Sequence, residues 1–485
     1  MPAVRPYPVP SRSPMAGLRR RRLGFPQVLA QSVAAVAPAA AMATSPLLVL
    51  AAVGTLPVWT FALATVVVVV VGYCVGQFSR RMAAAGGIYS FTAKGLGPAP
   101  AVAAGWSLLI GYAAVAMSGL LGVGLFFPAV FGASSGLVSG LVTAAAGLAV
   151  LGLMRRGIGV SARVSLVLEL ASIALITTVL AVLLVSEAPR ADLGRLVTGS
   201  TSLTSAAVAV MLAVTAFVGF ESATTLGVEA RRPYLAVTRA VLWTPPVLGA
   251  VYLFAAGTLS IGVQGAPAGV LDSATPLPAL MAVHGLGWLA PLVNAAVASS
   301  FFACAVASCN ALVRVVLCMG REGILPAALG RAHRRFGTPH VAILASLPVV
   351  TAVPVGLLLA GVGRRTALLD LLTLSADGYA LAYVLVCTAA PVFLHRIGEL
   401  TRAAAATGIT GAALLAAVLW QAVVVPARSA TPVAAIFLGL LAVGLAYVGW
   451  LLRCAPERLA RVGLYDEASA VDVLPDPFGP EPVDR

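Results

Sequence analysis

The sequence predicts an all-α integral membrane protein with twelve transmembrane helices. The 485-residue chain is 60% hydrophobic and only 10% charged, whereas soluble domains are typically about 25% charged. Residues 23–79 and 99–154 contain no charged side chain, and each run is long enough for two spans of about 20 residues. Such long apolar runs do not alternate as barrel strands do, so the spans are expected to be helices.

Twelve apolar runs follow one another along the chain, separated by charged or turn-forming residues. The expected spans are residues 27–53, 58–79, 99–128, 133–154, 161–186, 203–228, 237–262, 285–318, 340–360, 366–394, 404–426 and 431–452. We expect residues 23–395 to form a ten-helix core and residues 396–453 to add two helices. Residues 1–22 form a basic N-terminal tail and residues 454–485 a C-terminal tail.

The positive charges indicate how the chain is oriented in the membrane. With the N-terminus placed in the cytoplasm, 26 of the 31 Lys and Arg residues fall on the inner side. The other five fall outside, at Arg190, Arg195, Arg364, Arg365 and Arg428. Because cytoplasmic loops are enriched in Lys and Arg, both termini are predicted to be cytoplasmic in a multi-pass plasma-membrane protein. The net charge of +14 is therefore an orientation signal and does not indicate nucleic-acid binding.

Residues that could form an enzyme centre or a metal site are scattered along the chain. The six cysteines lie in or beside apolar runs and form no CxxC motif, and the four histidines lie in or near loops without ligand spacing. Cysteines in such positions usually serve as small, buried apolar residues. We therefore expect no enzymatic activity, no metal site and no cofactor.

Two spans contain residues that interrupt a helix. Span 1 includes the segment AVAPAAAMATSP with Pro38 and Pro46, and proline removes a backbone hydrogen bond. Span 6 has Gly219 two residues before the charged Glu221. Spans 1 and 6 are five apart and so run in opposite directions, as an inverted repeat with a midplane site requires. In the alternative interpretation, Pro38 only kinks its helix and Gly219 only permits close packing.

Four acidic residues lie within the expected spans: Glu169, Glu221, Asp370 and Asp377. Asp377 is about 11 residues into span 10, or roughly 16 Å by helical rise, so it is expected to face a cavity. The sequence places no Lys or Arg at the same depth, which favours neutral or cationic substrates over acidic ones. Glu221 is predicted to respond to protons, and the alternative is a permanently hydrogen-bonded carboxylate that holds two half-helices together.

Three stretches together resemble the amino acid–polyamine–organocation superfamily of transporters. They are AAAGGIYSFTAKGLGPAPAVAAGW (83–106), AFVGFESATTLGVEARRP (216–233) and RVVLCMGREGILPAALGRAHRRFGTPHVAI (314–343). Their order and spacing agree with the family over roughly residues 25–395. The resemblance implies a five-plus-five inverted-repeat fold with broken helices 1 and 6, and secondary active transport of amino acids or related amines.

The resemblance also implies which residues bind the substrate. In the family, backbone N–H groups in the break of span 1 hold the substrate carboxylate, and the matching residues are Ala37, Pro38, Ala39, Ala40 and Ala41. Carbonyl groups in the break of span 6 hold the substrate amine, and the matching residues are Ala216, Phe217 and Gly219. Phe217 or Phe220 would act as an apolar lid. Some members use the glutamate that matches Glu221 for pH sensing or gating.

The coupling ion is the least determined part of the resemblance. Some proton-coupled members carry a lysine in span 5, where this sequence has Ser172, and the only lysine in the chain is Lys94. Ser172 and Ser308 are candidate oxygen ligands for sodium. We expect proton coupling, and a sodium-coupled symporter or an exchanger remains the alternative. A membrane sensor that does not transport is the alternative from another functional class.

Overall fold

The computed structural model describes residues 13–466, except residues 14, 16, 54–56, 134, 193, 195–202, 268, 334–335 and 425–431. Within this part of the chain, twelve helices are long and apolar enough to cross a membrane. Their ends differ from the expected spans by only a few residues, so the predicted all-α architecture with twelve spans is confirmed. The expected outer cations Arg195 and Arg428, and the distal parts of both tails, lie outside the described residues.

The spans follow one another in chain order, and the first and sixth each consist of two pieces. They are α1 (Phe25–Ala34) with α2 (Pro38–Val53), α3 (Pro57–Ser79), α5 (Pro98–Ala129), α6 (Gly136–Arg155), α7 (Ile158–Glu187), α8 (Leu203–Thr215) with the 3-10 helix η3 (Phe220–Leu226), α9 (Pro233–Gly262), α12 (Ala290–Arg321), α13 (His340–Leu359), α14 (Arg364–Arg396), α15 (Arg402–Val424) and α16 (Val433–Cys454). Short helices lie in the connections, namely α4 (Ile88–Leu96), α10 (Gly269–Asp272) and α11 (Pro276–Val283), and α17 (Pro456–Leu459) follows the last span.

Prolines mark where several of these helices begin. Pro38, Pro57, Pro98 and Pro233 are each the first residue of their helix. The first helical position needs no N–H group for an intrahelical bond, and the fixed φ of proline suits it. Pro46, in contrast, lies inside α2 without ending it. Of the two prolines in span 1, Pro38 therefore marks the interruption.

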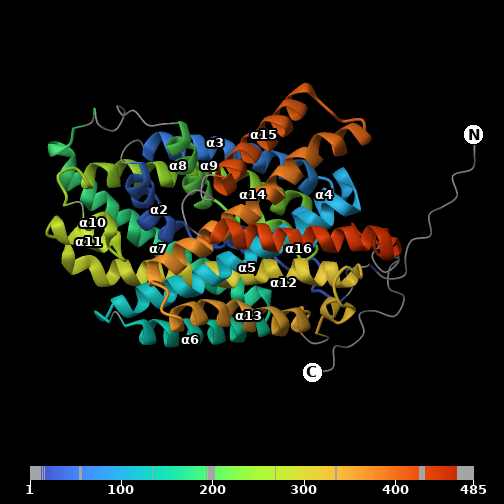
Figure 1. The fold of residues 1–485 in the computed structure, drawn as a ribbon, viewed down its shortest axis with the longest axis horizontal. Coiled ribbons are helices and arrows are strands. Elements are labelled where there is room, and N and C mark those ends of the chain that lie inside the picture. The colour runs from blue at the N-terminus through green and yellow to red at the C-terminus, as the bar shows by residue number, and fades with distance from the viewer. Residues whose placement is uncertain are drawn as a thin grey trace, which may run out of the picture.

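The helices form an elongated bundle in which α5 and α12 run through the middle (Figure 1). Helix α12 packs against α5 and α7, α14 packs against α5 and α15, and α3 packs against α9. Helices α6 and α13 pack together along one edge of the bundle. The central position of α5 and α12 places their side chains beside the interrupted spans.

Both predicted interruptions are present, and they pack against each other. Helix α1 ends at Ala34 and α2 begins at Pro38, with Ala37 at a φ of +53°. Helix α8 ends at Thr215, and Gly219 has a φ of +98° before η3 begins. A Cβ atom at Gly219 would lie 2.9 Å from the carbonyl oxygen of Ala35, so a glycine is required where the two breaks meet.

Candidate functional site

A partly open pocket lies where the two breaks meet. Its walls include Ala37, Ala40 and Ala41 from the first break and Ala216 and Val218 from the second. Hydroxyl groups come from Thr44, Ser45, Ser118, Thr215 and Thr373, and a thiol comes from Cys304. Among the described residues that line the pocket, none carries a charged side chain.

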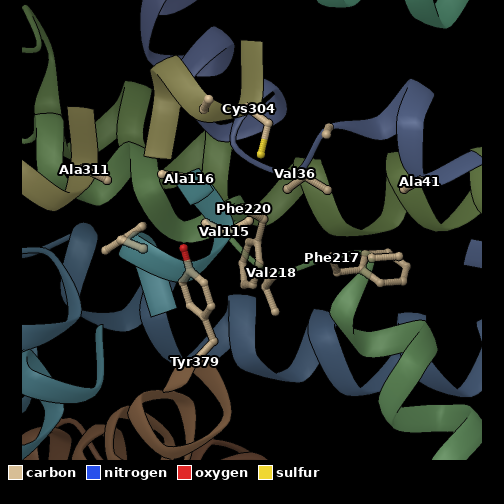
Figure 2. Close-up of a cluster of buried hydrophobic side chains, with 14 of the residues drawn as sticks. Val36, Ala41, Val115, Ala116, Phe217, Val218, Phe220, Cys304, Ala311 and Tyr379 are labelled. Carbon is tan, nitrogen blue, oxygen red and sulfur yellow. The ribbon is translucent and has the colours of Figure 1, made fainter. Parts of the chain in front are cut away.

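The pocket lies on one side of the breaks. Arg20 forms an ion pair of 2.8 Å with Asp466, so the two described chain ends meet, and we call their side the inner side. Helix α2 leads away from that side, and its residues Thr44, Ser45 and Leu48 line the pocket. The pocket therefore occupies the outer half of the bundle. In Figure 2, Cys304, Val36 and Phe220 lie around the junction of the breaks.

The first turn of α2 has its N–H groups occupied by the chain itself. The N–H of Ala39 donates to Glu169 Oε1 at 3.1 Å, and the N–H of Ala40 donates to Ser300 Oγ at 3.1 Å. The N–H of Ala41 donates to the carbonyl of Ala37 at 2.9 Å, and Pro38 has no N–H. The resemblance assigns these groups to a substrate carboxylate, but it gives no indication that Glu169 reaches them from α7.

The carbonyl groups of the second break also have partners. The hydroxyl of Tyr252 donates to the carbonyl of Ala216 at 2.8 Å, and the N–H of Ser222 donates to the carbonyl of Gly219 at 2.9 Å. Phe217 and Phe220 are fully buried and are not part of the pocket wall. Phe217 instead stacks edge-on against Tyr252, with 4.9 Å between ring centroids.

Below the pocket, the inner pieces of the broken spans are tied together by buried hydrogen bonds. Ser32 Oγ donates to the carbonyl of Phe220, and Ser222 Oγ donates to the carbonyl of Gln31 at 3.0 Å. Gln31 Nε2 donates to the carbonyl of Ala307 on α12 at 2.7 Å. These bonds join α1, η3 and α12 and close the inner side of the breaks.

Glu221 lies in this closed region and has no exposed surface. The hydroxyl of Tyr112 on α5 donates to Oε1 at 2.9 Å, and the hydroxyl of Tyr383 on α14 donates to Oε2. The N–H of Gly219 donates to the hydroxyl of Tyr383 at 3.4 Å. Glu221 thus links three elements through two tyrosines. Motif spacing could not identify these tyrosines, because each lies more than 100 residues from Glu221 in the chain.

Asp377 is the least satisfied of the buried acids. It is 1% exposed, and neither carboxylate oxygen has a hydrogen-bond partner among the described residues. Thr373, four residues earlier on the same face of α14, lines the pocket, so Asp377 is about 6 Å deeper along the helix. Asp377 itself is not part of the wall. The following Gly378 lets α14 pack against α5, because a Cβ there would lie 2.7 Å from the nitrogen of Gly111.

The two serines suggested as sodium ligands each have local partners. Ser172 Oγ donates to the carbonyl of Leu168 at 2.7 Å and lies 2.5 Å from Ser299 Oγ. Ser308 Oγ lies 3.8 Å from the sulfur of Cys304. The part of the chain that the structure describes contains no group of three or more His, Cys, Asp or Glu side chains that could hold a metal ion.

The sequence profile described as amino acid permease matches residues 27–456. The chain belongs to the amino acid permease family. The resemblance to its superfamily is thereby confirmed, and the permease is a transporter rather than an enzyme. The twelve apolar helices found among its described residues make it a multi-pass membrane protein.

Several curated proteins are similar to the permease. An uncharacterized transporter of Mycobacterium tuberculosis is 30% identical over 348 residues, which cover 69% of this chain and 73% of that protein. The branched-chain amino acid permease BcaP of Bacillus subtilis is 24% identical over 350 residues, covering 69% and 72%. The methylthioribose transporter of Bacillus subtilis is 25% identical over 295 residues, covering 58% and 63%.

Solved structures support the fold. A manganese transporter of Eremococcus coleocola superposes with a TM-score of 0.58 over 90% of this chain and 95% of that chain. Only 13% of the residues are identical, so this similarity concerns the architecture alone.

Proposed function

We propose that the permease is a secondary active transporter of amino acids or related amines that are neutral or cationic. The observation that carries the proposal is the pocket at the junction of two broken helices, walled by backbone, hydroxyl and apolar groups. Broken helices of opposite direction are where transporters of this architecture bind small substrates near the midplane. The family and the relatives named for amino acids support this substrate class.

The charges around the pocket support substrates without a net negative charge. Glu169, Glu221 and Asp377 are buried beside or beneath the breaks. The buried cation Arg314 is bound to Glu229, with 2.6 Å between Nε and Oε2, and is therefore not free to hold an acidic substrate. A cationic group of a substrate would be attracted by the three acids, whereas an additional carboxylate would be repelled.

Alternating access supplies the transport mechanism in this proposal. The pocket is open on the outer side, and the bonds between α1, η3 and α12 close the inner side. Transport would require these inner bonds to open while the outer half closes around the substrate. Coupling arises if an ion binds the two arrangements with different affinity.

Protons are the proposed coupling ion, and Glu221 is the proposed proton-binding group. As a carboxylate, Glu221 accepts hydrogen bonds from both tyrosines; once protonated it must itself donate, so one tyrosine has to turn or release it. Because Tyr112 and Tyr383 belong to different helices, the protonation state is linked to how α5, α14 and η3 pack. Sodium coupling through Ser172 or Ser308, and exchange, remain the alternative mechanisms.

The deciding experiment is uptake into proteoliposomes with a panel of labelled amino acids and amines. We expect accumulation of a neutral or cationic compound that depends on an inwardly directed proton gradient and persists without sodium. Accumulation that requires sodium, or only an internal counter-substrate, would replace proton coupling by symport with sodium or exchange. If no member of the panel is bound or transported by folded protein, the transport proposal fails and a sensor role gains support.

The orientation in the plasma membrane is a separate part of the proposal. Both termini are proposed to be cytoplasmic, because the inner loops carry most of the arginines. A single cysteine at position 190, on a background without other cysteines, should react with an impermeant reagent outside intact cells. Labelling of a cysteine at position 155 from outside would reverse the orientation.

A further inference from the structure

The start of α2 is the natural place for an anion in the pocket. The first turn of a helix leaves N–H groups without intrahelical partners, and its dipole favours negative charge. Because Pro38 has no N–H, only the next three residues can donate. Ala40 and Ala41 also line the pocket wall, so a substrate carboxylate would be expected at this position.

An acid of the permease already occupies this position. Glu169 Oε1 accepts the N–H of Ala39 at 3.1 Å and the hydroxyl of Ser300 at 2.9 Å. Ser300 Oγ in turn accepts the N–H of Ala40 at 3.1 Å. Glu169 and Ser300 have no exposed surface. Together with the bond from Ala41 to Ala37, these contacts leave no unpaired donor in the first turn of α2.

The second oxygen of Glu169 provides an independent observation that points to a ligand. Oε2 is buried and has no hydrogen-bond partner among the described residues, although a carboxylate oxygen can accept more than one hydrogen bond. A buried acceptor without a donor is unfavourable. Ser300 is followed directly by Phe301 and, one turn later, by Cys304, and both of these line the pocket. The carboxyl group of Glu169 thus lies directly behind the pocket wall.

We propose that Glu169 is a built-in substitute for a substrate carboxylate, so that the permease selects amines that lack a free α-carboxylate. This inference rests on the proposed function and narrows its substrate class. Glu169 holds the helix end that a substrate carboxylate would need, and its charge attracts an ammonium group in the pocket. An amino acid would bring a second carboxylate next to Glu169 and would have to displace it from Ala39. The described pocket wall offers no cation for such a carboxylate.

Matched ligand pairs test this inference in purified full-length protein. The pairs are leucine with 3-methylbutylamine, phenylalanine with 2-phenylethylamine, and lysine with cadaverine, each pair differing only in the carboxylate. Isothermal titration calorimetry should give at least tenfold tighter binding for the amine of one or more pairs. If, in every pair that shows binding, the amino acid binds at least as tightly as its amine, the inference is overturned while the transport function stands. If it binds no member of any pair, the inference is overturned, and the proteoliposome panel decides the transport proposal separately.

Two variants at Glu169 separate recognition from folding. Glu169→Gln keeps an acceptor for the N–H of Ala39 and removes the charge, so amine affinity should fall at least tenfold while the protein remains monodisperse. Glu169→Ala frees that N–H, and the ratio of amino acid to amine affinity should rise at least tenfold. Unchanged affinities in folded Glu169→Gln protein would overturn the inference.

Ser165→Ala is the matched control on the same helix. Ser165 lies one turn before Glu169 on α7 and is 2% exposed, and its hydroxyl is not part of the chain of bonds to α2. This variant should leave the preference between amine and amino acid unchanged. A shift equal to that of the Glu169 variants would make the effect a general consequence of altering α7 and would overturn the inference.

Discussion

The outer and inner halves of the permease differ in how their polar groups are used. The outer half surrounds a pocket with hydroxyl groups, such as those of Thr44 and Thr373, and no charged side chain among its described lining residues. The inner half contains a buried ion pair between Arg314 and Glu229, with 2.6 Å between Nε and Oε2 and 3.2 Å between Nη2 and Oε1. Polar groups thus line a pocket in the outer half, whereas in the inner half they bind structural elements to one another.

Backbone contacts strengthen the closure of the inner half. The N–H groups of Arg22 and Leu23 donate to the carbonyl of Glu229 at 2.7 and 2.8 Å, and the N–H of Arg231 donates to the carbonyl of Leu23 at 2.9 Å. Leu23 and Ala230 thereby form a short parallel bridge. The chain before α1 is held against the chain after η3, so the inner ends of both broken spans are fixed together.

The C-terminal segment adds a second layer to this closure. The N–H groups of Gly463 and Leu464 donate to Glu322 Oε1 at 2.9 and 2.8 Å, and the hydroxyl of Tyr89 on α4 donates to Glu322 Oε2. Asp466 pairs with Arg20 at 2.8 Å. Under the proposed alternating access, opening the inner side would have to break these buried polar contacts.

The largest effect is expected where the two breaks touch, at Gly219. Gly219→Ala places a Cβ 2.9 Å from the carbonyl oxygen of Ala35 and strains a backbone with a φ of +98°. Such strain costs of order 1–3 kcal/mol, and it separates the two breaks, so uptake should fall at least tenfold. Gly257→Ala is the control, because no atom lies within 4 Å of a Cβ at that helical position. Equal uptake by both variants would contradict close contact of the breaks.

Glu221 tests whether the inner network responds to protons or only holds the helices. Glu221→Gln keeps the size of the side chain and removes titration, so uptake should persist with a flattened pH dependence. Tyr112→Phe keeps the acid but removes one of its donors, and its uptake should remain dependent on pH. An unchanged pH profile of folded Glu221→Gln protein would reject the proton role, whereas loss of folded protein would favour the structural one.

Asp377 tests whether the charge below the pocket contributes to selectivity. Asp377→Asn removes a negative charge one helical turn below Thr373, so a cationic substrate should lose affinity about tenfold while a neutral substrate of similar size changes little. Competition assays with lysine and leucine, or with cadaverine and 3-methylbutylamine, measure the difference. Equal changes for both members of a pair would make Asp377 a structural residue.

The smallest effect is expected at the inner surface, where Glu322 anchors the C-terminal segment. Burial raises the pKa of the Glu322 carboxyl to about 7, and the hydrogen bonds from Tyr89, Leu464 and Gly463 offset only part of this increase. At pH values between the ordinary pKa near 4.5 and the raised pKa of about 7, Glu322 holds a proton when the C-terminal segment is docked and lacks it when the segment is undocked. Docking should therefore weaken as the pH rises through about 7.

Hydrogen exchange of residues 456–466, corrected for intrinsic rates, measures this docking. Protection should be higher at pH 6 than at pH 8 in the wild type. Glu322→Gln stays neutral at both pH values and should show the smaller difference. Stronger protection at pH 8 than at pH 6 in the wild type would contradict the burial argument.

The spans and both breaks could be predicted from the sequence, because each depends on residues that are close together in the chain. Apolar runs of the necessary length specify the helices, while Pro38 and Gly219 interrupt them through their own backbone chemistry. Partners between helices could not be predicted in this way. Glu169 reaches Ala39 across 130 residues of sequence, and nothing in the helical pattern of α7 indicates which neighbour its carboxylate faces.

For some of the site residues that the resemblance implies, the side-chain contacts depend on how the helices pack and could not be predicted from the motif. Phe217 or Phe220 was expected to act as a lid over the substrate; in the structure, the ring of Phe217 packs against Tyr252 outside the pocket wall. Two tyrosines from other helices bind the oxygens of Glu221, and the motif around Glu221 indicates neither of them. Motif spacing identifies which residues lie near the breaks, whereas the rotation of each helix decides what each side chain contacts.

Access to the two sides of the breaks tests the difference between the halves most directly. Single cysteines at Thr44, in the outer pocket, and Ser222, in the inner network, are introduced into protein without other cysteines and exposed to a hydrophilic thiol reagent in detergent. Both sides are then in contact with solvent, so the packing of the protein alone controls the rates. We expect rapid reaction at position 44 and at least tenfold slower reaction at position 222, with Arg314→Ala accelerating only the latter. Equal rates at both positions without that substitution would contradict a closed inner half.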